Sequence, residues 1–163
     1  MAVLFKGCEI LDVALEIEKT GQAFYEELSK CARDEGVKKV VRFMVGEEEQ
    51  HFETFKAMQE ALACENFSPS EGYPGEYEAY VRALADSRVF TDERDIREEC
   101  RRLDNDSDAI QMAIGLEKDS IVFYNEMARF VRESDKPTIA KIVDEERAHI
   151  VKLWELKTKL AVA

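Results

Sequence analysis

The sequence predicts an all-α protein, an antiparallel four-helix bundle with one long crossover that contains short helices. The composition favours helices, because 36% of the 163 residues are charged and 45% are hydrophobic, with only seven glycines and three prolines. In four long segments, apolar residues recur at alternating spacings of three and four, as on one face of an α-helix. A stretch rich in helix breakers separates the first two segments from the last two.

The first two helices are expected to be neighbours joined by a short turn. The first runs from about Cys8 to Asp34, and the second runs from about Val37 to Cys64. Gly36 lies between them, and glycine commonly follows the last residue of a helix. A short turn of this kind makes the two helices antiparallel.

The crossover is expected to extend from about Glu65 to Asn105. It opens with several helix breakers and then carries two short helical patterns, at roughly residues 76–86 and 92–102. A link of this length is too long for a hairpin. It can instead run the length of a bundle, so that the second helix pair lies antiparallel to the first.

The second helix pair follows the crossover. Its first helix is expected to begin near Asp106 or Ser107, which are both favourable N-cap residues, and to end near Val131. Its second helix is expected to start between Ser134 and Pro137 and to continue to about Leu160. Proline suits the first turn of a helix, because its missing N–H would have no partner there.

The chain is expected to be one domain, residues 1–163, made of a helix pair at 8–64, a crossover at 65–105 and a helix pair at 106–160. It contains no run of 18 apolar residues, so no transmembrane helix is expected. Its start lacks the apolar segment of a signal peptide, so the expected location is the cytoplasm. The formal charge of −12 argues against nucleic acid or a membrane surface as a partner.

The four cysteines do not form a C-x-x-C pair. This excludes a zinc ribbon or a rubredoxin-type iron site built from this chain. Reduced thiols are expected for a cytosolic protein. Cys8 and Cys64 are the two cysteines that the predicted helices could bring together, at one end of the first helix pair.

The two histidines of the chain end the same tetrapeptide, Glu-x-x-His. Each tetrapeptide follows another glutamate that has a tyrosine seven residues after it, and corresponding positions lie 98 or 99 residues apart. The residues of this repeat are Glu18, Tyr25, Glu48 and His51 in the first half and Glu117, Tyr124, Glu146 and His149 in the second half. Two copies of one metal half-site are the simplest explanation.

The four glutamates of the repeat interrupt the apolar faces of their helices, so we expect them to be buried. Four buried carboxylates would repel one another strongly, and two divalent cations would balance their charge. Glutamate and histidine three residues apart lie on one helix face and can reach the same ion. The sequence therefore predicts a dinuclear site with the ligands Glu18, Glu48, His51, Glu117, Glu146 and His149.

Within this site, Glu48 and Glu146 are expected to bridge the two ions. Carboxylate and imidazole ligands suit iron or manganese, and they suit zinc less well. The hydroxyls of Tyr25 and Tyr124 could hydrogen-bond to ligand carboxylates of the opposite helix pair, although core tyrosines that only fill space are the alternative. The glutamate before each bridging residue could accept the far N–H of a ligand histidine, or it could be a surface residue.

These residues resemble the ferritin-like superfamily, and most closely the di-iron domain of rubrerythrins. The resemblance extends over the four long helices. Besides the repeat, it rests on the stretches Leu15–Lys19, Phe24–Glu27, Leu116–Lys118 and Phe123–Tyr124. It implies a ferritin-like fold, a centre of two iron ions that reduces hydrogen peroxide or dioxygen, and a homodimer. Manganese or zinc would also be chemically acceptable at such a centre.

Two departures from the typical rubrerythrin pattern bear on function. The chain has no rubredoxin domain, so electrons would come from a separate donor such as a rubredoxin. Where many rubrerythrins have a further glutamate, three residues after the third-helix ligand, this chain has Ser120, which Gly21 matches in the first half. The resulting six-ligand centre keeps two alternatives open, a ferroxidase that oxidises Fe²⁺ and a bundle that metal only stabilises.

Overall fold

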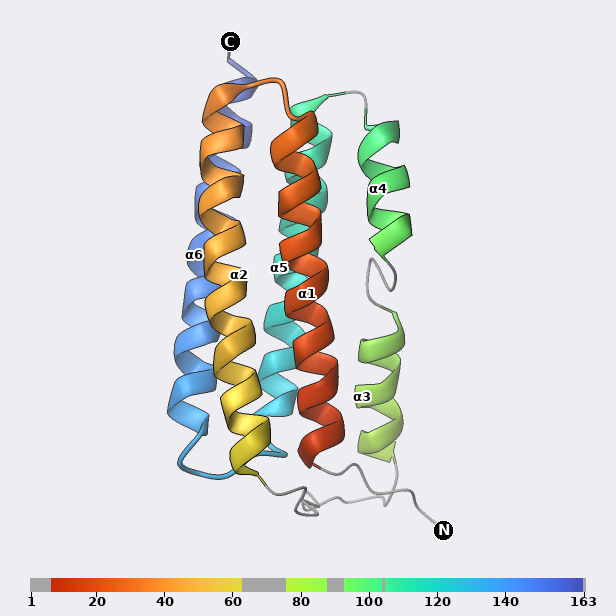
Figure 1. Ribbon diagram of the computed structural model, residues 1–163, viewed down its shortest axis with the longest axis vertical. Helices are drawn as coiled ribbons and strands as arrows, with labels where there is room; N and C mark the ends of the chain where they lie inside the picture. Colours follow the sequence, from red (N-terminus) through yellow and green to blue (C-terminus); the bar gives the residue numbers. More distant parts are fainter. Residues whose placement is uncertain (1–6, 63–75, 88–92, 104, 163) are drawn as a thin grey trace.

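Four long helices pack side by side in the computed structural model of the chain (Figure 1). The structure describes residues 7–62, 76–87, 93–103 and 105–162. The long helices are α1 (Gly7–Cys31), α2 (Glu35–Ala61), α5 (Asp106–Met127) and α6 (Lys136–Leu160). The closest packing is between α1 and α2 and between α5 and α6, and the partners in each pair run in opposite directions (Figure 1). The predicted all-α antiparallel bundle is therefore confirmed.

The crossover contributes two short helices, α3 (Glu76–Asp86) and α4 (Glu93–Arg102). They lie one after the other along the side of the bundle, and α4 packs against α1 while α3 packs against α5 (Figure 1). The sequence predicted both helices to within one residue. The helix breakers expected before α3 lie outside the described residues.

The turn between α1 and α2 begins earlier than the sequence predicts. Helix α1 ends at Cys31 rather than at Asp34, because Asp34 is the N-cap of α2. Its carboxylate accepts a hydrogen bond of 3.0 Å from the backbone N–H of Val37. Asp106, in the first turn of α5, accepts hydrogen bonds from the N–H groups of Arg33 at 3.0 Å and of Asp34 at 2.7 Å. The turn is therefore attached to the second helix pair.

The last turn predicted for α5 is not helical. The helix ends at Met127, four residues before Val131. Phe130 and Val131 are nevertheless buried, so the apolar pattern continues after the helix has ended. Helix α6 begins at Lys136, with Pro137 in its first turn, as predicted.

The core consists of two apolar clusters, one on each side of a layer of charged residues. The first cluster lies around the end of the bundle where α1 begins, and α3 covers it with Val81 and Ala85. The second cluster lies around the opposite end, and α4 covers it with Ile96 and Cys100. Each long helix passes from one cluster to the other through a buried glutamate. The predicted burial of these glutamates is confirmed.

Two further expectations concern membranes and cysteines. None of the helices in the described ranges is both long enough and apolar enough to cross a membrane. The contact expected between Cys8 and Cys64 lies outside the described side chains. The cysteine side chains that the structure describes are Cys31, which is exposed, and Cys100, which is buried, and both are free thiols.

Candidate metal centre

Six side chains meet in the charged layer at the middle of the bundle. Each of them is at most 4% exposed. They come from all four long helices and are Glu18 of α1, Glu48 and His51 of α2, Glu117 of α5, and Glu146 and His149 of α6. The structure thus brings together every residue that the sequence indicated as a metal ligand.

The six side chains form two overlapping groups. One group is Glu18, Glu48, His51 and Glu146, and the other is Glu48, Glu117, Glu146 and His149. In each group, one possible ligand atom from every residue lies within 4.8 Å of the others. Glu48 and Glu146 belong to both groups, so each has the position that a bridging ligand requires.

The ring of His51 presents one nitrogen to the cluster and the other to an outer carboxylate. Its Nδ1 lies 3.1 Å from Oε1 of Glu146 and 3.6 Å from Oε2 of Glu18. Its Nε2 lies 3.1 Å from Oε2 of Glu145. A hydrogen bond at the far nitrogen fixes the orientation of a ligand histidine and the position of its proton. Glu145 therefore has the position expected for such a partner.

The ring of His149 has the same orientation but a looser outer contact. Its Nδ1 lies 2.9 Å from Oε2 of Glu146 and 3.6 Å from Oε1 of Glu117. Its Nε2 lies 3.8 Å from Oε2 of Glu47, which is too far for a hydrogen bond. The expected outer carboxylate is thus a hydrogen-bond partner in the first half of the repeat and only a near neighbour in the second.

Two tyrosines link the helix pairs through the glutamates. The hydroxyl of Tyr25 donates to Oε1 of Glu117, and the hydroxyl of Tyr124 donates to Oε1 of Glu18. These hydrogen bonds confirm the expected contacts and exclude tyrosines that only fill space. Burial, and then the negative charge of the glutamate that each contacts, raises the pKa of both phenols well above the usual value. Both hydroxyls therefore keep their protons and remain donors.

The carboxylates differ in their affinity for protons. Burial, followed by repulsion from Glu146, raises the pKa of Glu48 well above its usual range. The same two causes raise the pKa of Glu117 to about 8. Burial alone would also raise the pKa of Glu146, but contacts with His149 and His51 outweigh it and lower the pKa to about 2. Before a cation enters, Glu146 is therefore ionised while Glu48 and Glu117 hold protons at neutral pH.

The two histidines carry the positive charge of the cluster. Burial alone would lower the pKa of His51, but contacts with Glu146 and Glu18 raise it to about 11. Burial also disfavours charge on His149, and contacts with Glu117 and Glu146 raise its pKa to about 9. The surroundings therefore favour positive charge at this position in the bundle.

The cluster also contains acceptors that no protein group satisfies. Three buried carboxylate oxygens, Oε2 of Glu18, Oε1 of Glu48 and Oε1 of Glu146, form no hydrogen bond of good geometry. Nδ1 of His51 lies near two of them, at 3.1 Å from Glu146 and 3.6 Å from Glu18, but it also forms no hydrogen bond. Unpaired buried acceptors are costly, and native structures contain few of them. Divalent cations would satisfy these oxygens and balance their charge. The residues present therefore fit two metal ions.

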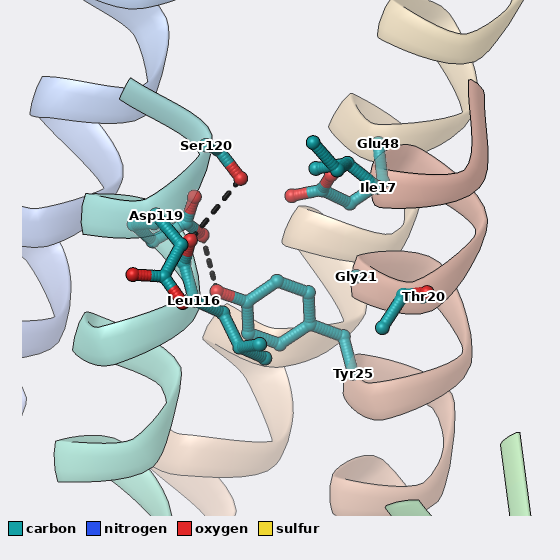
Figure 2. Close-up of a pocket in the computed structure, with 9 residues that line it drawn as sticks. Ile17, Thr20, Gly21, Tyr25, Glu48, Leu116, Asp119 and Ser120 are labelled. Carbon is teal, nitrogen blue, oxygen red and sulfur yellow. Dashed lines mark hydrogen bonds between the residues drawn. The ribbon is translucent and has the colours of Figure 1, made fainter. Parts of the chain in front are cut away.

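A small pocket opens beside the cluster between α1 and α5 (Figure 2). Its volume is about 20 Å³, which is room for about one water-sized molecule. Figure 2 shows Tyr25 and Glu48 extending toward α5 and Ser120 facing them from that helix. The hydroxyl of Ser120 donates to the backbone carbonyl of Leu116 at 3.1 Å. Ser120 therefore shapes the pocket rather than adding a charge to the cluster.

Gly21 has a role that the sequence did not reveal. A Cβ at this position would lie 2.9 Å from Oε2 of Glu48, which is closer than such atoms approach. The glycine thus provides the space that the Glu48 carboxylate occupies. The signal was present in the sequence, because Gly21 lies on the buried face of α1, three residues after Glu18, where a larger apolar side chain would be usual.

Two overlapping groups of buried glutamate and histidine in a four-helix bundle define a ferritin-like protein with a candidate site for two metal ions. The family model for rubrerythrin matches residues 9–157, and the chain belongs to the rubrerythrin family. No curated protein sequence matches the chain.

Two solved structures are similar to the chain. A proposed ferritin-like diiron-carboxylate protein from Thermotoga maritima has a TM-score of 0.71 and 29% identity, over 95% of this chain and 96% of that one. A hypothetical protein from Pyrococcus furiosus has a TM-score of 0.65 and 22% identity, over 96% of this chain and 91% of that one. The second likeness concerns the fold alone.

Proposed function

We propose that the protein is a di-iron oxidoreductase that reduces hydrogen peroxide or dioxygen with electrons from a separate donor, such as a rubredoxin. The observation that carries the proposal is the small pocket that Tyr25, Glu48 and Glu117 line beside the cluster. This pocket suits a molecule as small as peroxide or dioxygen and has no room for a larger organic substrate. The donor is separate because the chain has no C-x-x-C pairs to hold a second iron site.

In this proposal, Glu18 and His51 would hold one ion, Glu117 and His149 would hold the other, and both ions would share Glu48 and Glu146. Two ferrous ions bound by these residues would supply the two electrons that split the O–O bond of peroxide. Iron is supported by the family and by the mixture of oxygen and nitrogen donors. Manganese or zinc would use the same donors.

Tyr25 is the residue that we assign to proton handling. Its hydroxyl lines the pocket, donates to Glu117 and keeps its proton because burial raises its pKa. It can therefore orient the Glu117 carboxylate or, by turning its single O–H away from Glu117, donate to an oxidant in the pocket. Tyr124 orients Glu18 in the same way, but it packs against Phe55 and does not line this pocket.

The proposal is tested by reducing iron-loaded protein chemically under anaerobic conditions and mixing it rapidly with hydrogen peroxide. We expect fast oxidation of the ferrous centre, followed by optical absorption, with one peroxide consumed per pair of irons. A ferrous centre that peroxide leaves unchanged would show that the protein is not a peroxidase.

A variant of Ser120 tests whether the oxidant uses this pocket. Ser120→Leu is expected to fill the pocket and slow oxidation by peroxide roughly tenfold or more, while the iron content stays the same. Ser29→Leu is the matched control, because Ser29 also donates to a backbone carbonyl of its own helix, is half-buried and does not line this pocket. Equal rates in the two variants would exclude the pocket as the route.

A ferroxidase is the second candidate function. Ser120 stands where a further carboxylate would make the centre asymmetric, and a second cavity, of about 120 Å³, lies beside His51. Glu47 and Glu145 line that cavity, so cations could approach the cluster from this side. The two functions differ in stoichiometry. A ferroxidase consumes many Fe²⁺ per chain in air, whereas a peroxidase without its electron donor stops after two.

A further inference from the structure

Two cysteines meet at a distance from the metal centre. Cys31 is the last residue of α1, and Cys100 lies in the last turn of α4. Both line one cavity of about 190 Å³, together with apolar side chains that include Leu28, Leu103 and Ala109. The cavity lies where the crossover packs against the bundle, so the two thiols belong to different parts of the fold.

The two thiols contact each other. They line the same cavity, and each thiol affects the pKa of the other. Cys31 is exposed, whereas Cys100 is buried at 6% exposure. An outer thiol that solvent reaches and an inner thiol in contact with it form the arrangement in which one sulfur can react with an oxidant and the other can displace the product.

We propose that Cys31 and Cys100 form a reversible intramolecular disulfide when the protein meets hydrogen peroxide. The sulfur of Cys31 attacks one oxygen of peroxide, the O–O bond breaks, and sulfenic acid and one water result. The sulfur of Cys100 then attacks the sulfur of Cys31, forming the S–S bond and releasing a second water. The two thiols lose two electrons and two protons in total, and one peroxide becomes two waters.

The surroundings keep both thiols of this pair protonated. Burial raises the pKa of Cys31, and burial with the nearby Cys31 thiol raises the pKa of Cys100 to about 12. The carboxylates of Glu27, Glu99 and Asp106 act in the same direction. Since the thiolate is the reactive form, the reaction is slow compared with that of an activated cysteine. The cavity provides space for the side chains to rotate as the bond forms.

The disulfide would fasten the crossover to the bundle. Helix α4 contributes Ile96 and Cys100 to the second apolar cluster, and it packs against α1. A covalent bond between residues so far apart in sequence restricts the unfolded chain and stabilises the folded one. The oxidised protein is therefore expected to unfold at a higher temperature than the reduced protein, by at least about 4 °C.

The test uses the full chain with Cys8→Ser and Cys64→Ser, so that only the proposed pair remains. After treatment with excess peroxide, we expect loss of both free thiols, a mass lower by two hydrogen atoms, and a cross-linked peptide that contains Cys31 and Cys100. Dithiothreitol should restore both thiols. Thermal unfolding of the oxidised and reduced forms measures the stabilisation.

Two control variants separate the disulfide from other oxidation. In Cys100→Ser, the sulfenic acid of Cys31 should persist long enough for a dimedone label to trap it, and oxidation should not raise the unfolding temperature. Cys31→Ser changes an exposed residue and should fold normally, with Cys100 remaining a thiol. Unreacted thiols, a disulfide between two chains, or sulfinic acid on Cys31 beside reduced Cys100 would each overturn the proposal.

Discussion

At the scale of single residues, Gly21 sets how closely α1 approaches the Glu48 carboxylate. A Cβ there would lie 2.9 Å from Oε2 and 3.1 Å from Cδ of Glu48. The carboxylate of Glu48, which belongs to both ligand groups, would therefore have to move. Gly46 of α2 offers a contrast, because a Cβ at that position would contact nothing within 4 Å.

The variants Gly21→Ala and Gly46→Ala are therefore expected to have different effects. Gly21→Ala should fold but bind metal at least about tenfold more weakly, because Glu48 is displaced. Gly46→Ala should bind metal normally and should raise the free energy of unfolding by about 0.5–1 kcal/mol, as alanine does in a helix interior. Metal analysis and chemical denaturation measure both effects. Full metal content in Gly21→Ala would show that the contact does not matter.

The two tyrosines allow a second comparison at this scale. Tyr25→Phe and Tyr124→Phe each remove a buried hydrogen bond to a carboxylate, so each should lower the free energy of unfolding by about 1–3 kcal/mol. Only Tyr25 lines the pocket, so only Tyr25→Phe should also slow oxidation by peroxide, by roughly tenfold or more. Stopped-flow kinetics of the reduced proteins provide the measurement, and equal slowing would assign both tyrosines a purely positioning role.

At the scale of helices, Asp106 joins the two halves of the bundle. It lies in α5, yet its carboxylate accepts hydrogen bonds from the backbone of the turn between α1 and α2, at Arg33 and Asp34. This carboxylate therefore helps to hold the turn to the second helix pair at that end of the bundle.

Removing this link is expected to destabilise the fold. Asp106→Ala should lower the free energy of unfolding by about 1–2 kcal/mol, because two backbone N–H groups lose a charged acceptor. Asp106→Asn keeps one acceptor oxygen and should cost less. Asp144→Ala is the control, since Asp144 forms an exposed ion pair with Arg147, and its loss should change the value by less than about 0.5 kcal/mol. Similar losses for Asp106 and Asp144 would contradict this role.

The helices show which features the sequence could predict. The centres of the helices and the buried glutamates follow a regular period, so the sequence placed them correctly. The helix ends do not depend on that period. Asp34 looked like the end of α1 but caps α2, and Val131 continues the apolar pattern of α5 although the backbone has left the helix. Asp34 in front of a helix was a recognisable N-cap signal.

Contacts between distant segments were harder to predict from the sequence than the set of candidate ligands. The cluster of glutamates and histidines was predictable because the motif is duplicated, so the residues of one half indicate the matching residues of the other. By contrast, the contact of Asp106 with the first turn, and that of Cys31 with Cys100, depend on where the crossover places α4 and α5. Pattern within one helix contains no information about such pairs, and only the packed structure reveals them.

At the scale of the whole molecule, a charged layer divides the core, and protons should leave this layer when metal enters. Glu117 has a pKa of about 8 and His51 of about 11, so both hold a proton at pH 7. Metal binding requires an ionised carboxylate and a neutral imidazole. Uptake of metal by chelator-treated protein should therefore release roughly two protons or more per chain and should strengthen as the pH rises through 8.

Calorimetry in buffers of different ionisation enthalpy measures this release. Protons should be released rather than taken up, because the pKa values of Glu117 and His51 are both raised. Below these values, protons compete with the cation for the same ligand atoms. Glu146 should contribute little to the release, since its pKa of about 2 leaves it ionised already. Identical binding enthalpies in all buffers would show that the ligands are unprotonated before metal binds.

The two halves of the cluster are not identical, and the difference between their histidine contacts has a chemical consequence. His51 can donate from Nε2 to Glu145 at 3.1 Å, whereas the corresponding distance from His149 to Glu47 is 3.8 Å. A carboxylate partner makes an imidazole a stronger electron donor. Two ions bound here would therefore receive different amounts of electron density from their histidine ligands. The ion beside His51 would be the harder one to reduce. If the two ions were different metals, each metal would prefer one of the two positions.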